Sequence, residues 1–303
     1  MVLNQQWQLL PPAPEEYLRA SGISPVIAQL LYNRGVKLNE IELFLAADNR
    51  LEGNPFLLLD VSQAADRIYK ALLSREKIAI YGDFDVDGIT ATTILVEGLA
   101  RLGGKVVHYI PDRFCEGHGL KLPAIEKLRN QGVSLLITVD CGITSLEEVK
   151  QAQEIGLDVI ITDHHLPAAT LPQAVAVIDP KRRDSRYPYS DLAGVGVAFK
   201  LLQALFYKHS KESSLDEFLD LVVLGTVADL VPLIGENRYL VKEGLRVLNN
   251  TQRIGIQEMV NLARLKPGEL NIESISWVLG PRLNAASRMD NASISYRLLT
   301  THS

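Results

Sequence analysis

One stretch of this chain decides its fold: Ile78-Ala79-Ile80-Tyr81-Gly82-Asp83-Phe84-Asp85-Val86-Asp87-Gly88-Ile89-Thr90. Its apolar start, Ile78–Tyr81, is typical of a central strand in a parallel sheet, because such a strand is covered on both faces. The strand is expected to stop at Gly82 and to be followed by a turn and then by a helix that starts at about Ile89. Ligands of open parallel sheets bind at the carboxyl ends of the strands, where this turn lies.

The turn carries three carboxylates, those of Asp83, Asp85 and Asp87. Two like charges about 4 Å apart repel each other by roughly 4 kcal/mol at an effective dielectric constant near 20. Holding the three side chains together therefore requires a bound cation, a raised pKa or side chains that point apart.

The composition is that of an ordinary globular protein. The chain has 303 residues, of which 47% are hydrophobic and 22% are charged. Its two cysteines, Cys115 and Cys141, are too few for a disulfide framework or a cysteine metal cage. The net charge of −5 argues against a protein that coats nucleic acid by bulk charge, but it leaves room for a nucleic-acid enzyme with local basic patches. Because the sequence has neither a signal-peptide pattern nor a long apolar stretch, we expect a cytoplasmic protein with no membrane partner.

Strands and helices alternate after Lys77. Strands are expected at residues 78–81, 106–110, 134–139, 159–162 and 175–178, with helices between them. This order is typical of a doubly wound α/β fold with a mainly five-stranded parallel sheet. Residues 1–76 are expected to form a helical cap packed on the core. Residues 77–303 would form the main domain, with the sheet in 77–180 and a mostly helical part in 181–303.

Aspartates follow four of the five expected strands. They are Asp83, Asp85 and Asp87 after the first strand, then Asp140, Asp163 and Asp179 after the last three. One such aspartate could simply cap the next helix, but four strand ends with His164 and His165 beside one of them are hard to explain in that way. Carboxylates and imidazoles without thiolates suit Mn²⁺ or Mg²⁺. The sequence therefore predicts a divalent-metal site at this edge of the sheet.

A pair of ions about 4 Å apart could clamp the attacking and leaving oxygens of a phosphoester. Asp140 is the expected bridging carboxylate, because its strand is expected to lie beside the first strand. Asp163 is expected to orient the neighbouring histidines through hydrogen bonds. Arg113, Arg282 and Arg288 each lie in a segment that contains Gly or Pro, which we expect to be a loop, and they are candidates to grip phosphate.

These motifs resemble those of a known family. Asp163-His164-His165 is the motif of the DHH phosphoesterases, and Tyr81–Ala91 resembles the first motif of the RecJ-type single-stranded-DNA exonucleases within that family. The resemblance continues through Tyr109–Leu120, Val139–Ile143, Ile178–Lys181, Leu192–Lys200, Gly225–Asp229 and Gly280–Arg288. It covers nearly the whole chain, and so many motifs in the same order are highly specific.

The resemblance implies a 5′-to-3′ exonuclease on single-stranded DNA, active in DNA repair and recombination, with residues 77–303 as its catalytic domain. Two divalent ions are implied as cofactors, with Mn²⁺ preferred and Mg²⁺ as the alternative. By motif, Asp85 and Asp140 would hold one ion. Asp87, Asp140, His164 and Asp229 would hold the other.

The remaining site residues follow from the same resemblance. His165 would act at the scissile phosphate, and Asp83 would join the catalytic group as an alternative ligand or a hydrogen-bond partner. Arg113 would bind the 5′-terminal phosphate, while Arg282 and Arg288 would contact the DNA backbone. The implied partners are single-stranded DNA with a 5′-phosphate and a repair helicase or single-strand-binding protein.

Other interpretations stay open at this point. Members of the family continue into a second domain that closes the substrate cleft, so we expect this chain to be a catalytic core without that clamp. One alternative is a DHH phosphodiesterase that acts on short oligonucleotides or nucleotide phosphates. Another is a non-catalytic DHH-like scaffold, although such proteins lose ligands and every ligand position is filled here. A receiver-like phosphoacceptor domain would leave the histidine pair and Asp229 unexplained.

Overall fold

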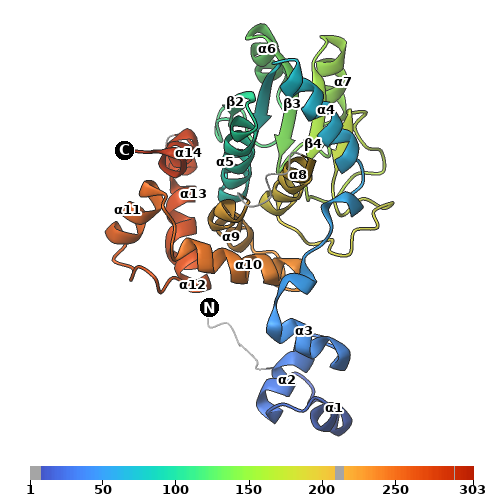
Figure 1. Cartoon of the computed structure of the whole chain (residues 1–303), viewed down its shortest axis with the longest axis vertical. Coiled ribbons are helices and arrows are strands. Elements are labelled where there is room, and N and C mark those ends of the chain that lie inside the picture. The colour runs from blue at the N-terminus through green and yellow to red at the C-terminus, as the bar shows by residue number, and fades with distance from the viewer. Residues whose placement is uncertain (1–7, 209–214, 290) are drawn as a thin grey trace, which may run out of the picture. The chain divides into compact units, whose positions relative to one another are not determined.

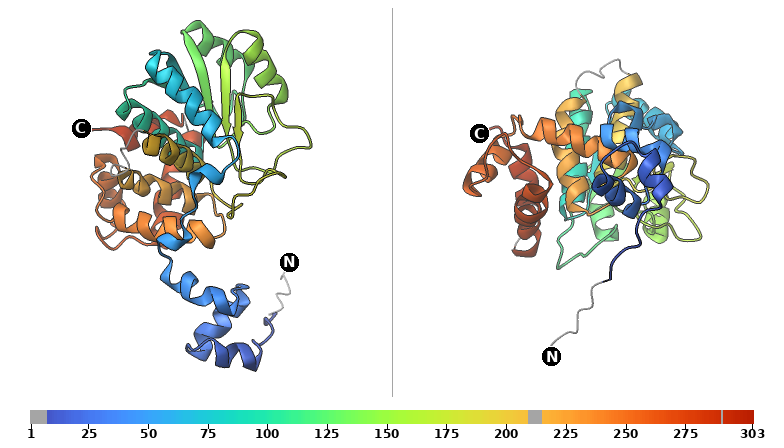
Figure 2. Two further views of the ribbon diagram at one scale, coloured as in Figure 1. Left: turned by 45° about the vertical axis from the view of Figure 1, so that its right-hand side comes forward. Right: turned by 90° about the horizontal axis from the view of Figure 1, so that it is seen from below.

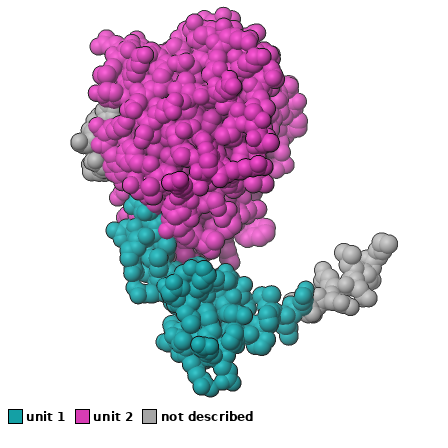
Figure 3. All heavy atoms as spheres, turned by 90° about the vertical axis from the view of Figure 1, so that its right-hand side faces the viewer, with its two compact units in different colours: residues 1–52 teal, residues 53–303 magenta. Residues whose placement is uncertain are grey.

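The computed structural model describes residues 8–208, 215–289 and 291–303. The chain divides into two compact units, residues 1–52 and residues 53–303, which Figure 3 distinguishes by colour. Every helix within the described residues falls short of the length and apolarity that a bilayer crossing requires.

The first unit is small and helical. Its elements are α1 (Glu15–Ala20), α2 (Pro25–Asn33), η1 (Leu38–Glu40), α3 (Ile41–Ala46) and η2 (Asn49–Leu51). α2 begins at Pro25, where the fixed φ of proline suits the first helical turn. Tyr17, Leu31 and Ile41 belong to its apolar cluster, and the Tyr17 hydroxyl donates to the Val36 carbonyl at 2.7 Å.

The second unit is built around five parallel strands in the order β2-β1-β3-β4-β5 (Figure 1). The strands are β1 (Lys77–Tyr81), β2 (Lys105–Tyr109), β3 (Val133–Val139), β4 (Asp158–Thr162) and β5 (Ala176–Ile178). All five predicted strands are confirmed, with each boundary within one residue. The expectation that the strand before Asp140 lies beside the first strand is also confirmed, because β3 pairs with β1.

Helices cover both faces of the sheet (Figure 2). α4 (Val61–Leu73), α5 (Val86–Arg101) and α8 (Gly194–Lys208) share one apolar cluster with Ile78 and Ile80. α6 (Leu122–Asn130) and α7 (Leu146–Glu154) share the other cluster with Ala79 and Tyr81. Alternate residues of β1 thus face opposite layers, and both layers exclude water, which explains why this strand is apolar throughout.

The unit boundary lies earlier than the expected limit near residue 76. α4 contributes Ala64 and Ile68, both fully buried, to the cluster that contains Ile78 and Ile80. It therefore belongs to the sheet unit, because its apolar stripe is covered by the sheet layer. The packing of the N-terminal segment on the core stays a prediction.

The C-terminal part is helical, as predicted. Its elements are η5 (Asp216–Phe218), α9 (Leu219–Ala228), α10 (Gly235–Leu248), α11 (Ile254–Leu262), α12 (Ile272–Ser274), η6 (Ile275–Leu279), α13 (Gly280–Met289) and α14 (Ser293–Thr300), and η3 (Pro55–Leu57) precedes α4. The expected loop around Arg282 and Arg288 is wrong, since both lie in α13. η6 is a turn of π-helix just before Pro281. Such a turn changes the hydrogen-bonding register, so the proline ring and its missing N–H are accommodated without ending the helix.

Candidate metal centre

The register of the sheet brings three strand ends to one level. Tyr81 of β1 pairs with Thr138 of β3, so Asp83 and Asp140 each lie two residues beyond a matched pair. Val139 pairs with Thr162 of β4, which places Asp140 level with Asp163. Carboxylates that are far apart in sequence therefore meet at the edge where parallel sheets hold ligands.

Asp85 fixes the start of α5. Its Oδ1 accepts a hydrogen bond from the Gly88 N–H at 3.0 Å, as the side chain of an N-cap residue does. The helix consequently begins at Val86, three residues before the expected start at about Ile89. This correction places Asp87 inside the first helical turn, where its side chain is buried.

Asp87 accepts hydrogen bonds from the N-terminus of another helix, α8. Its Oδ2 accepts from the Gly194 N–H at 2.6 Å and its Oδ1 from the Val195 N–H at 2.7 Å. These are free amide groups of the first turn of α8, which favours a carboxylate. This contact was not predicted from the sequence. The only signal for it was that Gly194 and Gly196 open an apolar helix.

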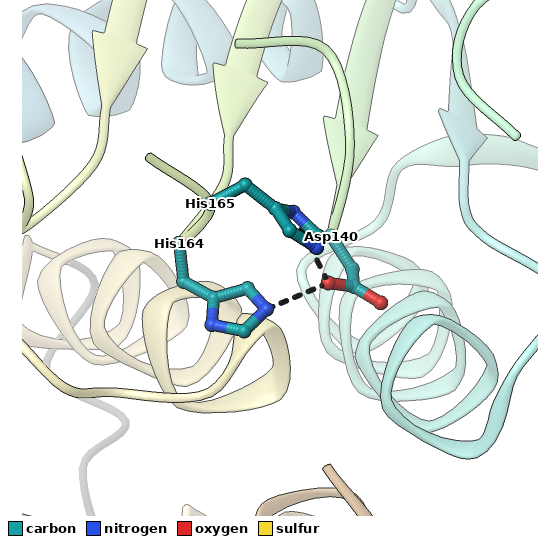
Figure 4. Close-up of side chains that lie close together, drawn as sticks. All are labelled: Asp140, His164 and His165. Carbon is teal, nitrogen blue, oxygen red and sulfur yellow. Dashed lines mark ion pairs between the residues drawn. The ribbon is translucent and has the colours of Figure 1, made fainter. Parts of the chain in front are cut away.

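Asp140 lies at the middle of the arrangement, with its backbone in the left-handed region at φ 58°. Its Oδ1 lies 3.0 Å from His164 Nε2 and 4.0 Å from His165 Nδ1 (Figure 4). Both Asp140 Oδ1 and His164 Nε2 are buried, yet neither makes a well-aligned hydrogen bond. Buried polar atoms normally find partners, so two that face each other unsatisfied fit a shared cation.

The cation-binding groups overlap. Three sets of side chains have ligand atoms within 4.8 Å of one another: Asp140, His164 and His165; Asp87, His164 and Asp229; and Asp83, Asp85 and Asp140. We call these seven residues the acidic cluster. His164 Nε2 also lies 3.7 Å from Asp87 Oδ2 and 3.7 Å from Asp229 Oδ2. The structure therefore brings together all five residues predicted to be metal ligands, and their individual roles stay predictions.

Electrostatics favours a bound cation. Burial, followed by the neighbouring carboxylates, raises the pKa of Asp87 and of Asp140 well above the usual range. Burial also raises the pKa of Asp229 to about 6, with Asp85 adding to the effect. Burial lowers the pKa of His164 to about 4, so its imidazole is neutral near pH 7, the form that binds metal. A divalent ion would compensate the charge that these carboxylates cannot otherwise carry together.

Asp163 orients the histidine pair, as predicted. Its Oδ1 accepts from the His164 N–H at 2.7 Å and from the His165 N–H at 3.1 Å, and it lies 2.7 Å from His165 Nδ1. Its Oδ2 accepts from the Ile143 N–H at 2.9 Å. The hydrogen bond to Asp163 raises the pKa of His165, whose side chain is half exposed. His165 is thus held through Nδ1, which leaves its Nε2 for another partner.

Residues 77–226 match the model of the DHH family, N-terminal domain. The chain belongs to the DHH family. It is 45% identical over 278 residues to the single-stranded-DNA-specific exonuclease RecJ of Bacillus subtilis, a match that covers 91% of this chain and 35% of the relative.

Two solved structures extend the comparison. A crystal structure of exonuclease RecJ bound to manganese is 37% identical with a TM-score of 0.73, over 80% of this chain and 61% of that one. The structure of RecJ in complex with Mn²⁺ from Thermus thermophilus is 32% identical with a TM-score of 0.82, over 98% of this chain and 43% of that one. This DHH chain thus spans between 35% and 61% of the length of these relatives.

His118 is a neighbour of the acidic cluster that the sequence did not single out. Its Nδ1 lies 3.1 Å from Asp83 Oδ1, and its ring centroid lies 5.6 Å from that of His165. The contact with Asp83 raises the pKa of His118. The residue lies inside the quoted segment Tyr109–Leu120, but a lone histidine in a glycine-containing loop gave no indication of an acidic partner 35 positions earlier.

The three candidate phosphate-binding arginines are placed differently. The Arg113 guanidinium lies over the ring of Phe84, 4.9 Å from its centroid, and Phe84 stands between Asp83 and Asp85 in the chain. Arg288 lines a cavity together with Ala228 and Leu230, the chain neighbours of Asp229. Arg282 is exposed, and its Nη1 donates to the Val278 carbonyl of the preceding turn at 3.0 Å. Two of the three predicted arginines thus contact, or share a cavity with, chain neighbours of the acidic cluster, and their phosphate-binding roles stay predictions.

Asp179, like Asp163, is a strand-end aspartate outside these three sets. It is buried, its Oδ1 accepts from the Lys181 N–H at 2.7 Å, and burial raises its pKa to about 7. None of the cation-binding groups found among the described residues includes it.

Proposed function

We propose that this DHH chain is a metal-dependent 5′-to-3′ exonuclease on single-stranded DNA that acts in repair and recombination. The observation that carries the proposal is the position of Asp140, which belongs to two of the three cation-binding groups and approaches His164, the member shared with the third. This overlap suits two ions that share a bridging carboxylate. The substrate class rests on the similarity to the single-stranded-DNA-specific exonuclease RecJ, and the metal rests on the similarity to two RecJ structures that contain manganese.

The donor set fits Mn²⁺, since it offers carboxylate oxygens and a neutral imidazole without thiolates. Asp85 and Asp140 would hold one ion, and Asp83 would be an alternative ligand for it or a hydrogen-bond partner. Asp87, Asp140, His164 and Asp229 would hold the other. When bound, the ions would neutralise charge on the attacking and leaving oxygens of the phosphodiester.

The chain's own residues would hold the phosphate and move a proton. His165 would donate from Nε2 to the oxygen that leaves phosphorus as water adds, while Asp163 keeps Nδ1 occupied and favours the protonated ring. Arg113, held over Phe84, would bind the 5′-terminal phosphate, and Arg288 would contact the strand's backbone. The implied protein partners and the cytoplasmic location stay predictions.

The first test compares wild type with Asp140→Asn on a 5′-labelled single strand in Mn²⁺. Loss of a bridging ligand is expected to cost several kcal/mol of charge stabilisation, so cleavage should fall by at least about 100-fold. Isothermal titration should show that at least one Mn²⁺ site is lost, while the circular dichroism spectrum is unchanged. Retained cleavage in this variant would contradict the bridging role.

The second test concerns the substrate. Wild type should degrade a long 5′-phosphorylated strand and leave the matching duplex intact, whereas Arg113→Ala should lose mainly the preference for a 5′-phosphate over a 5′-hydroxyl. Faster hydrolysis of a dinucleotide than of the long strand would favour the phosphodiesterase on short oligonucleotides. Absence of both Mn²⁺ binding and hydrolysis would favour the non-catalytic scaffold.

A further inference from the structure

A cavity of about 280 Å³ lies between the end of α9 and the continuous helix formed by η6 and α13. Its walls include Val227, Leu230, Ser276, Pro281, Asn284 and Arg288. None of the roles proposed for the acidic cluster uses this space.

The cavity adjoins the acidic cluster on two sides. Val227 and Leu230 flank Asp229 in the chain. Asn284 Oδ1 accepts a hydrogen bond from the Val86 N–H at 3.0 Å, and Val86 lies between Asp85 and Asp87. A molecule in the cavity would therefore touch the same segments that carry the predicted metal ligands.

The chemistry of the walls suits a nucleotide. Val227, Leu230 and Pro281 offer apolar surface for a flat base, while Ser276 and Asn284 offer polar groups for its edge. Arg288 is exposed and carries the positive charge that a phosphate requires. Apolar surface with a few placed polar groups is the usual make-up of a small-ligand site.

Leu230 is unusual in two ways. Its side chain is 80% exposed, and its backbone adopts φ 62°, a region that a bulky residue rarely occupies. Strained residues of this kind gather at ligand-binding sites, where the surroundings hold them in place. Leu230 follows the C-cap residue of α9, where a left-handed residue commonly ends a helix, and this turn leaves its side chain exposed at the cavity.

Trp277 adds an exposed aromatic ring beside the cavity. Its side chain is 78% exposed, and it follows the lining residue Ser276. It precedes Pro281, which also lines the cavity, by four residues, which is close to one turn where the segment is π-helical. Proteins that hold single strands commonly stack bases on exposed aromatic rings.

We propose that this cavity and Trp277 form a nucleotide subsite, in which one base of a single strand stacks on Trp277 and Leu230 and its phosphate pairs with Arg288. The subsite rests on the proposed function, and it adds a base-contacting surface that is separate from the 5′-phosphate site at Arg113.

The test uses the tryptophan itself as the probe. The chain has two tryptophans, so Trp7→Phe leaves Trp277 as the single fluorophore. This variant is titrated with a 12-residue oligothymidylate in EDTA, which prevents cleavage. Stacking should quench the fluorescence, and an abasic strand of the same length and charge should bind without quenching.

Two further variants separate stacking from charge. Trp277→Ala should weaken oligothymidylate binding by about 5- to 100-fold, with rescue by Trp277→Phe, and it should leave abasic-strand binding unchanged. Arg288→Ala should weaken both strands equally and reduce the salt dependence of binding. Leu230→Ala should also weaken oligothymidylate binding. Leu262→Ala is its matched control: it removes an equally exposed leucine, at the end of α11, and should leave oligothymidylate binding unchanged.

The outcomes separate the two proposals. The subsite would be overturned if the protein hydrolysed oligothymidylate but binding did not quench the Trp277 fluorescence. It would also be overturned if Trp277→Ala lowered the affinity for the oligothymidylate and the abasic strand equally. Either result would leave the nuclease proposal standing. If the protein neither binds nor hydrolyses single strands, both proposals fail. Binding of a protein ligand at Trp277 that no oligonucleotide displaces would also overturn the subsite.

Discussion

At the scale of single residues, the pairing of Asp163 with His165 holds the imidazole ring in place and raises its pKa. Asp163 is buried and accepts from three backbone N–H groups as well as facing the His165 ring. Although burial opposes it, the contacts with His165 and the backbone keep the pKa of Asp163 below its usual value. A carboxylate that stays charged at this depth fixes the ring and favours its protonated form.

Asp163→Asn should therefore lower kcat by about 10- to 100-fold with a smaller change in KM. Because the negative charge that raises the pKa of His165 is removed, the alkaline fall in activity should move to lower pH. Steady-state kinetics from about pH 5.5 to 9 would measure both effects, a range that spans the ordinary histidine pKa.

Asp179→Asn is the matched control, since Asp179 is also a buried strand-end aspartate, but its Oδ1 accepts from the Lys181 N–H, whereas Asp163 Oδ1 faces the His165 ring. Its kcat and pH profile should stay near those of wild type. An unchanged pH profile in Asp163→Asn would mean that Asp163 only supports the backbone.

Sequence predicted these residues to different degrees. The seven members of the acidic cluster lie in motifs or at strand ends, so their positions could be inferred from the order of elements. The contact between His118 and Asp83 could not, because it depends on how a loop folds back over the sheet edge.

At the scale of elements, the first turn of α8 packs directly against two members of the acidic cluster, Asp140 and Asp87. A Cβ atom on Gly194 would lie 2.7 Å from Asp140 Cβ and 2.8 Å from its Oδ1. The helix start must also approach Asp87 closely enough to donate two N–H groups. Only glycine satisfies both demands at this position.

Gly194→Ala should therefore displace Asp140 and abolish at least one Mn²⁺ site, even though alanine favours helix formation by about 1 kcal/mol. Isothermal titration would measure the loss of metal, and thermal melting would show that the fold remains.

Gly196→Ala, two residues later in the same turn, is the control. Its Cβ would meet nothing closer than Leu192 Cβ at 3.4 Å, an ordinary contact. This variant should bind Mn²⁺ like wild type. Equal metal binding in both variants would show that the helix start tolerates a side chain beside Asp140.

Local pattern predicted the strands well and one helix badly. Short uninterrupted apolar runs with turn residues on either side specify buried strands. The α13 segment carries Gly280-Pro281, which normally ends a helix, and only the preceding π-turn lets the helix continue. The π-turn lies against α9, and a contact between segments so far apart in sequence is not revealed by a local pattern.

At the scale of the whole sheet unit, the buried carboxylates link stability to pH and metal. Burial raises the pKa of Asp229 to about 6 and that of Asp179 to about 7, both above their values in an unfolded chain. Between about pH 4 and pH 7 the folded state then binds more protons than the unfolded state. Without metal, these groups make the protein less stable as pH rises through this window.

Mn²⁺ should reverse this trend, because it replaces the protons on the carboxylates. When the free ligand concentration is about 100 times its dissociation constant, binding raises the free energy of unfolding by about 2.7 kcal/mol. This corresponds to a rise of roughly 5–10 °C in Tm for a unit of this size. The shift should be clearly smaller near pH 5.5 than near pH 7.5, as differential scanning fluorimetry would measure. Asp140→Asn should show a much smaller shift, and a pH-independent shift in wild type would contradict the linkage.

The boundary of the sheet unit was predicted less well than its topology. The alternation of strands and helices indicated the parallel sheet, but nothing in the sequence showed that α4 packs with the strands rather than with the helices before it. Helix periodicity reveals that a helix has an apolar stripe, and it does not reveal which partner covers that stripe.

The acidic cluster draws its side chains from the ends of β1, β3 and β4 and from the end of α9, so its members span positions 83 to 229. Contacts this distant in sequence form slowly, because long loops must close first. The last of these elements to dock would complete the cluster. Metal capture could therefore serve as a late checkpoint during refolding, and the delay between the recovery of helical signal and the uptake of Mn²⁺ would time the final docking step.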